Sequence, residues 1–285
     1  MQVDVRGRLG ELVFARVAGP EGPQHRERIH RTAGERWFAE GRPIRRVHAD
    51  SSMFVGGLRA LLLQSLHPLA MAGVAGHSGY RGDPWGRLQR TSYFLAVTTF
   101  GLATDAQAAV ARVQRIHERV RGTAPDGRLY AASDPHLLRW VHIAEVDSFL
   151  RTYQTYGRAP LTLAEQNQYL ADTARVAHAL GVPDPPLTVA DLHAQLKAYR
   201  PELHGTPEAR AAARFMLLRP PLPIAARPAY AALAAAAVAS LPQWARLPLR
   251  LPYLPITEAT LVRAAGAGVV RTIRWATTAG PSETG

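Results

Sequence analysis

His117 is the residue of this sequence whose surroundings best suit an iron cofactor. It adjoins one apolar face of a helical pattern, formed by Val110, Val113, Ile116 and Val120. Heme iron accepts a neutral imidazole that a helix holds rigidly beside an apolar slot. The pattern therefore makes His117 a candidate axial ligand of heme iron. A half-buried histidine bonded only to a backbone carbonyl has the same spacing, so both interpretations stay open on spacing alone.

Several arginines accompany this histidine. Arg121 follows it by four residues, so its guanidinium projects from the same side, toward a heme propionate or the end of the helix. Arg87, Arg90 and Thr91 are spaced i, i+3 and i+4, and thus share one face of an earlier helix. In a gas-binding pocket these groups could donate hydrogen bonds to iron-bound oxygen. A solvated start of a helix has the same spacing.

Three further histidines, His67, His77 and His142, are expected to pack or to orient other ligands rather than to bind iron. Glu145 and Asp147 are candidate acceptors for such imidazoles. The sequence lacks the tight histidine spacing of a helical zinc site, a nucleophile elbow, a phosphate loop and a dinucleotide-binding glycine motif. Cysteine is absent, which excludes disulfides, thiolate-ligated heme and iron–sulfur clusters.

Composition limits the remaining classes of function. The chain has 285 residues and a formal net charge of +12, but its basic residues are scattered arginines, with Lys197 the only lysine. We therefore expect no nucleic-acid partner. The most apolar stretch, Ala229 to Leu241, is too short to span a bilayer, and the first ten residues do not resemble a secretion signal. We expect a cytoplasmic protein without a transmembrane segment, whose oligomeric state the sequence leaves open.

Helical periodicity dominates the chain, and few segments alternate with period two, so we expect an all-α fold. Residues 1–30 are predicted to be an irregular N-terminal arm, 31–276 a single helical domain, and 277–285 a frayed tail. Pro68 should break the helix that begins near Met53. The other predicted helices cover residues 35–40, 85–100, 106–121, 135–156, 162–180, 188–200, 207–219, 229–240 and 256–275.

An ordered succession of sequence blocks resembles one family. The blocks are Arg59 to Pro68, Asp83 to Thr91, Val113 to Gly122, Leu138 to Ser148, Leu218 to Pro221 and Ser240 to Arg246. They resemble the heme-dependent oxygenase family of latex clearing protein, which includes the mycophenolic-acid-pathway oxygenase. The resemblance covers roughly residues 50–255.

This resemblance implies a globin-like helical core, with additional N- and C-terminal helices, that holds heme b. In the family pattern His117 matches the proximal iron ligand, and Arg87 and Thr91 match distal residues of the rubber-cleaving members. Those members carry a lysine, able to close the sixth iron position, where this chain has Arg90. An arginine keeps its proton and should not ligate iron. We therefore expect an open or water-bound distal site, with Arg90 as a hydrogen-bond donor or gate, and a substrate other than polyisoprene.

The resulting hypothesis is a heme b-dependent oxygenase that uses O2 to oxidise or cleave an apolar small molecule, such as an isoprenoid or another alkene. In that hypothesis His117 ligates iron, Arg121 helps to hold heme, and Arg87, Arg90 and Thr91 act in catalysis. Two alternatives belong to other classes. One is a non-catalytic heme- or gas-binding protein, and the other is a heme-free helical scaffold that binds lipid.

Overall fold

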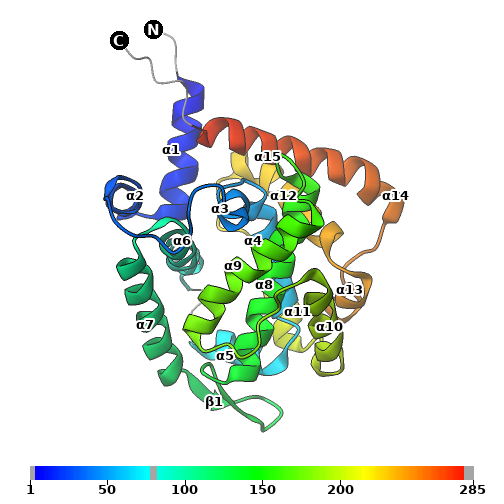
Figure 1. Ribbon diagram of the computed structural model, residues 1–285. Coiled ribbons are helices and arrows are strands. Elements are labelled where there is room, and N and C mark those ends of the chain that lie inside the picture. The colour runs from blue at the N-terminus through cyan, green and yellow to red at the C-terminus, as the bar shows by residue number, and fades with distance from the viewer. Residues whose placement is uncertain (1–3, 78–81, 279–285) are drawn as a thin grey trace, which may run out of the picture.

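The computed structural model describes residues 4–77 and 82–278, and within them the predicted all-α fold is confirmed (Figure 1). A single two-stranded hairpin accompanies the helices in these residues. The first half comprises α1 (Val5–Ala18), α2 (Gly22–Arg31), α3 (Pro43–His48), α4 (Met53–Gln64), α5 (Pro68–His77), α6 (Pro84–Phe100), α7 (Ala103–Arg119), β1 (Arg121–Thr123) and β2 (Leu129–Ala131). The second half comprises α8 (Pro135–Tyr156), α9 (Leu163–Leu180), α10 (Val189–Tyr199), η1 (Arg200–Glu202), α11 (Pro207–Leu218), η2 (Ile224–Ala226), α12 (Arg227–Ser240), α13 (Gln243–Leu249), α14 (Pro255–Thr257), η3 (Glu258–Val262) and α15 (Arg263–Thr277).

The long helix α8 lies at the centre and packs along α4 (Figure 1). Its start is fixed locally, because the Asp134 side chain accepts a hydrogen bond from the His136 amide and Pro135 occupies the first turn. Fully buried side chains of both helices, including Trp140 and Ile143 of α8 and Leu62 of α4, belong to the main hydrophobic core. Burial of these large apolar groups is the main stabilising contribution at this contact.

The predicted break at Pro68 is confirmed. The axes of α4 and α5 meet at 108°, since proline has no amide hydrogen for the helix ladder and clashes with the preceding turn. The His204 amide donates a hydrogen bond to the Leu66 carbonyl at 2.7 Å, which joins this bend to the segment after η1. His67 lies inside the bend and is buried.

The predicted irregular arm at residues 1–30 is wrong for its described part, which forms α1 and α2. Helix α1 packs on α15 and α6, although none of its residues is buried. A Cβ added at Gly10 would lie 2.5 Å from the Ala276 carbonyl oxygen, so α1 and α15 approach closely. The apolar residues Leu9, Val13 and Val17 recur every four positions and are half-buried, so α1 has a helical pattern that the prediction of an irregular arm missed.

Two other predicted boundaries also differ. No helix forms at residues 35–40, where Arg36 instead donates to the Ile29 and Phe100 carbonyls at 2.8 and 2.5 Å; the helix α3 begins at Pro43. Helix α7 ends at Arg119, and the chain continues into β1. The tail predicted to fray covers residues 277–285. All of it except its first two residues lies outside the described residues.

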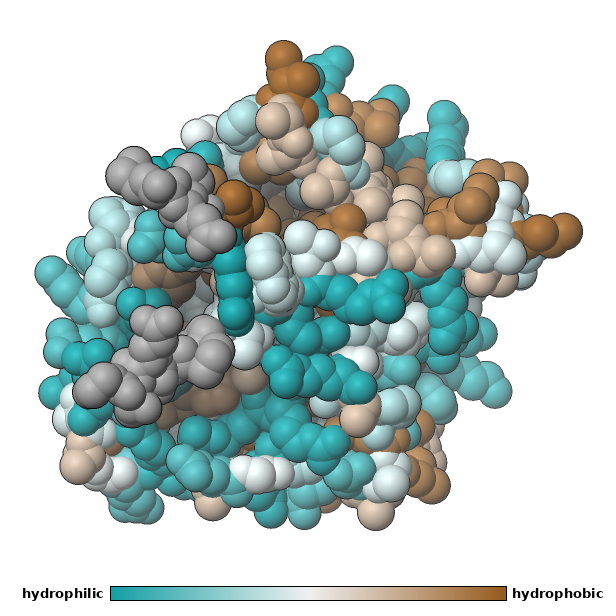
Figure 2. All heavy atoms as spheres, turned by 90° about the horizontal axis from the view of Figure 1, so that it is seen from above, coloured by the Kyte–Doolittle hydropathy of each residue, from teal (hydrophilic) through white to brown (hydrophobic). Residues whose placement is uncertain are grey.

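In the described ranges, no single helix has the length and apolar composition needed to cross a bilayer. Two pairs of consecutive helices have that length and composition when taken together, but each pair is sharply bent. Figure 2 shows hydrophilic side chains across the middle of one face, with apolar ones gathered toward the edge where α14 lies in Figure 1. Exposed apolar side chains of this region are Leu247, Leu254, Ile256 and Leu261.

Two buried arginines, Arg59 and Arg246, and the partly buried Arg274 tie the core helices together through ion pairs. Arg59 meets Asp147 at 2.7 Å, Arg274 meets Asp50 at 2.9 Å, and Arg246 meets Glu258 at 2.7 Å. Arg246 also donates to the carbonyls of Leu241 at 2.9 Å and Ala239 at 2.6 Å. A buried guanidinium with this many acceptors is satisfied only while every partner is present.

Glu258→Gln should therefore lower the free energy of unfolding by about 3 kcal/mol, because it leaves the Arg246 charge buried without a countercharge. Glu27→Gln is the matched control, since Glu27 pairs with Arg31 at 3.8 Å in full exposure. That control should change stability by less than about 1 kcal/mol. Urea unfolding of both variants measures the difference, and equal losses would contradict the role given to the buried pair.

Candidate active site

His117 lies in the last turn of α7 and is partly buried. Its ring forms no hydrogen bond with any residue in the ranges 4–77 and 82–278. Burial lowers the pKa of His117 below its usual value, so the ring is neutral at pH 7 and keeps a nitrogen lone pair. The adjacent apolar face runs from buried Val110 to Ile116, which is 49% exposed. The helix thus presents a free imidazole beside an incompletely covered apolar surface.

Arg121 opens β1 and is exposed. Its Nη2 donates to the Glu118 carbonyl at 2.6 Å, one of the carbonyls that the end of α7 leaves without a helical partner. We expected this guanidinium to lie near a heme propionate or at the end of the helix, and in the structure it lies at the end of the helix. An arginine carries five N–H donors, so most of them remain available for an anion.

Arg87, Arg90 and Thr91 all lie in the first half of α6, which a two-residue link joins to α7 and which packs against it. Arg90 and Thr91 are exposed, and Arg87 is partly buried. Arg90 pairs with Asp83, the N-cap of α6, at 3.3 Å. No hydrogen bond or ion pair in the described part of the chain joins His117 to Arg90 or Thr91. The structure therefore places Arg87, Arg90 and Thr91 on the helix that packs against the helix of His117.

Two ionisable groups on one face of α8 have no polar partner among the described residues. The buried Nε2 of His142 has no hydrogen bond, and neither has the Glu145 carboxyl. Burial, helped by the nearby His178, lowers the pKa of His142 to about 4. Burial raises the pKa of Glu145 to about 7. Unpartnered groups with strongly shifted pKa values in a protein interior are typical of functional sites.

Glu145 and Asp147 were candidate acceptors for hydrogen bonds from imidazoles, and the structure allows this role for only one of them. Asp147 is bound to Arg59 and so does not orient an imidazole, whereas Glu145 stays free to do so. His48 of α3 extends the polar interior and was missed by sequence reasoning. Its Nδ1 lies 2.8 Å from the Thr99 hydroxyl, and burial lowers its pKa to about 3. No motif surrounds His48, so only the tertiary fold could have identified it.

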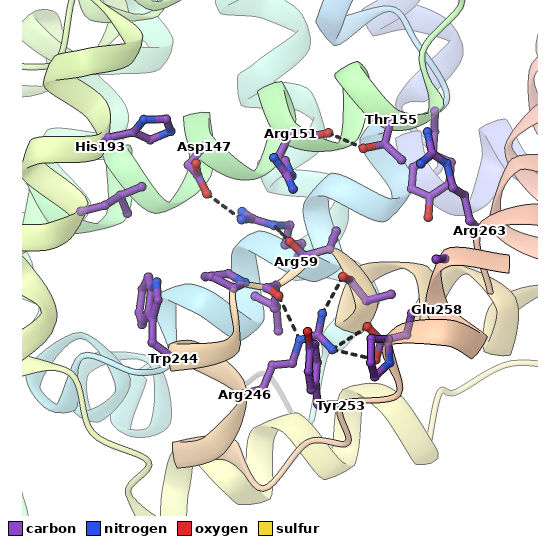
Figure 3. A pocket seen from close by; sticks show the side chains of 18 of the residues that line it. Arg59, Asp147, Arg151, Thr155, His193, Trp244, Arg246, Tyr253, Glu258 and Arg263 are labelled. Atoms are coloured by element: carbon purple, nitrogen blue, oxygen red, sulfur yellow. Dashed lines mark hydrogen bonds and ion pairs between the residues drawn. The ribbon is translucent and has the colours of Figure 1, made fainter.

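A separate cavity of about 580 Å³ opens among α4, α8, α10, α12, α13 and the start of α15 (Figure 3). The ion pairs of Arg59 with Asp147 and of Arg246 with Glu258 face it. Its wall also carries Arg151, which forms no ion pair within the described residues. The further cationic side chains that line it are Arg200 and Arg263. The cavity therefore has a cationic excess that suits an anionic group.

This cavity and the His117 region are on different sides of the molecule. Helix α7 follows the left edge of Figure 1, while α13 and α14 lie at the right. None of Arg87, Arg90, Thr91, His117 and Arg121 lines the cavity. Sequence reasoning did not find it, because its arginines come from helices far apart in the chain and follow no local motif.

Comparisons with known proteins identify a family over most of this fold. A family model described as the catalytic domain of the ER-bound oxygenase mpaB/B' and rubber oxygenase matches residues 45–275. Two curated relatives are uncharacterised proteins of Mycobacterium bovis and Mycobacterium tuberculosis, each 33% identical over 111 residues. The similar stretch is 38% of this chain and 43% of each relative, so the chain covers less than half of their length. No solved structure matches the chain.

Glu145→Gln should make stability less dependent on pH. The folded carboxyl titrates near 7, against 4.5 for its ordinary value. Between these values the folded protein holds a proton that the unfolded chain has lost, so the wild type loses stability as pH rises from 4.5 to 7. Glutamine has no such proton. The variant should match the wild type at low pH and exceed it increasingly up to neutrality.

Urea unfolding at low, intermediate and neutral pH measures this difference. His142 has the opposite pH dependence, because burial depresses its pKa, but it is present in both proteins and cancels in the comparison. A stability difference that stays constant with pH would show that Glu145 is already ionised in the folded protein at neutrality.

Proposed function

The chain belongs to the family of mpaB/B' and rubber oxygenase catalytic domains, and we propose that it is a heme b-dependent oxygenase acting on an apolar small molecule. The observation that carries this proposal is the neutral, unpartnered imidazole of His117 at the end of α7. Since the similarity to curated relatives covers only part of their length, the activity and substrate are inferred from the family and from the residues of this chain.

The donor set of the chain fits heme. A ring nitrogen of His117 would bind the heme iron, because it is deprotonated at neutral pH and bonds to nothing else in the described ranges. The exposed Arg121 would bind a propionate with the donors that it does not spend on the Glu118 carbonyl. When bound, heme b supplies the iron chemistry that activates O2.

The arginines of α6 would supply hydrogen bonds on the distal side. Arg90 cannot lose its proton, so it can donate but cannot occupy a coordination position. Its exposed contact with Asp83 at 3.3 Å is weak enough for the side chain to turn toward a ligand. Arg87 and Thr91 follow the same helix face and would orient O2 or the substrate.

Glu145 would exchange protons in the interior, because its pKa of about 7 allows both protonation states at neutrality. Arg90 in place of a lysine favours a substrate other than polyisoprene. We propose an isoprenoid or another alkene of small size, taken from the cytoplasm.

His117→Ala should abolish stoichiometric heme binding and the Soret absorption of the purified protein, because it removes the axial ligand. His25→Ala is the control, since His25 lies on α2 and its ring pairs, among the residues that the structure describes, with Glu21 at 3.6 Å and with the Tyr93 ring. The control should retain heme fully. Full heme content with an unchanged Soret band in His117→Ala would refute the ligand assignment.

Arg87→Ala should retain heme and lower turnover by about 100-fold, as the loss of one donor to a developing oxyanion commonly does. Oxygen uptake with a reductant and a small alkene, together with product analysis by mass spectrometry, measures turnover. A wild-type protein that binds heme but consumes no oxygen with any such substrate would be a heme or gas carrier. A protein that stays colourless after expression with heme would favour the lipid-binding alternative.

A further inference from the structure

Three side chains from distant parts of the chain come together at the bend between α4 and α5. They are His67, His136 and Glu202, and one donor atom from each lies within 4.8 Å of the other two. We propose that they form a binding site for one divalent transition-metal ion of the zinc type. None of the three belongs to the proposed heme site, so this metal would be a second, separate one.

His67 provides the first argument. It is 2% exposed, and both of its ring nitrogens are buried without a hydrogen-bond partner in the described residues. Buried polar atoms are nearly always satisfied, so an imidazole with two free nitrogens calls for an absent partner. Its Nε2 lies 3.4 Å from Oε2 of Glu202, which is longer than a good hydrogen bond. Two ligands of a tetrahedral zinc ion, each bound at about 2.1 Å, are separated by about 3.4 Å.

His136 provides the second argument, through its tautomer. The Tyr199 hydroxyl donates to the His136 carbonyl at 2.8 Å, so its oxygen is free to accept from Nδ1–H of the same histidine at 3.2 Å. The proton then resides on Nδ1, and the lone pair of Nε2 faces the Glu202 carboxylate at 2.9 and 3.0 Å. A lone pair opposite a carboxylate is repulsive, and either a proton on Nε2 or a metal ion that both groups bind removes this repulsion. In the proposed site the metal ion has this role.

The backbone holds all three ligands before any metal binds. His67 is fixed by the bend at Pro68, and His136 by the capped first turn of α8. Glu202 ends η1, and the segment after it is joined to the bend by the bond from the His204 amide to the Leu66 carbonyl. Preorganisation of this kind lowers the entropic cost of binding.

The chemistry of the three ligands selects the class of metal. Two imidazoles and one carboxylate favour first-row transition metals over magnesium and calcium, which prefer oxygen ligands. The side chains of His136 and Glu202 are half-exposed, so water can complete the coordination. Many zinc sites have three protein ligands and one coordination position open to solvent. The Tyr199 hydroxyl would orient the ligand His136, as groups around metal sites commonly do.

The test is a calorimetric titration of the full chain, without a histidine tag and stripped with a chelator, with Zn²⁺. We expect one zinc ion per chain and a higher melting temperature in its presence. Glu202→Gln and His136→Gln should weaken binding more than 10-fold, and Tyr199→Phe by about 10-fold. His193→Gln is the matched control, because His193 is an exposed histidine outside the cluster, and it should bind zinc as the wild type does.

The zinc X-ray absorption spectrum of the wild type should show two imidazole ligands, a signature that a merely structural role of these residues would not produce. The Soret band is recorded on the same samples and should not change in any of the variants, so this proposal can fail while the proposed heme function stands, and the reverse. No stoichiometric zinc binding by the wild type, or equal affinity in Glu202→Gln, would overturn the site. The contact between His136 and Glu202 would then be a hydrogen bond without a metal ion.

Discussion

The packing of α4 against α8 is the contact on which the rest of the structure depends. The two helices approach so closely that a Cβ at Gly56 would lie 2.7 Å from the Thr152 hydroxyl oxygen and 2.8 Å from the Phe149 ring. Arg59 of α4 reinforces the contact by bonding Asp147 and Ser148 of α8, both at 2.7 Å. The three-residue cluster at the bend, the cavity and the polar groups in the middle of α8 all include residues carried by, or adjacent to, these two helices. His67 follows the end of α4, His136 starts α8, and His142 and Glu145 occupy its middle.

Local sequence signals predicted much of this fold. The bounds of α6, α8 and α9 follow from their caps and prolines, and Thr162 forms a capping box with Glu165 at the start of α9. Signals of this kind act within one helical turn, and so they survive in any tertiary context. The N-terminal helices were missed because they bury few side chains fully, so the helical spacing of Leu9, Val13 and Val17 in α1 is a weak signal.

The candidate sites were predictable to different degrees. His117 and the α6 arginines could be selected because they lie in blocks that resemble a family, and that family is confirmed over residues 45–275. Their roles toward heme stay predictions. The partner of His136 is 66 residues away, and the cavity of Figure 3 draws its five arginines from five separate elements. Sites assembled by long-range packing have no spacing rule, since the fold alone determines which side chains meet.

The packing of α1 on α15 has a consequence for synthesis. Because α15 is made some 250 residues after α1, the first helix leaves the ribosome long before its partner exists. A strongly apolar helix in that position would expose its apolar surface to other chains until α15 is synthesised. Helix α1 has no fully buried residue even in the folded protein, so the apolar surface that its partners cover is small. Docking of α15 on α1 is therefore a late step of folding that joins the two ends of the described chain.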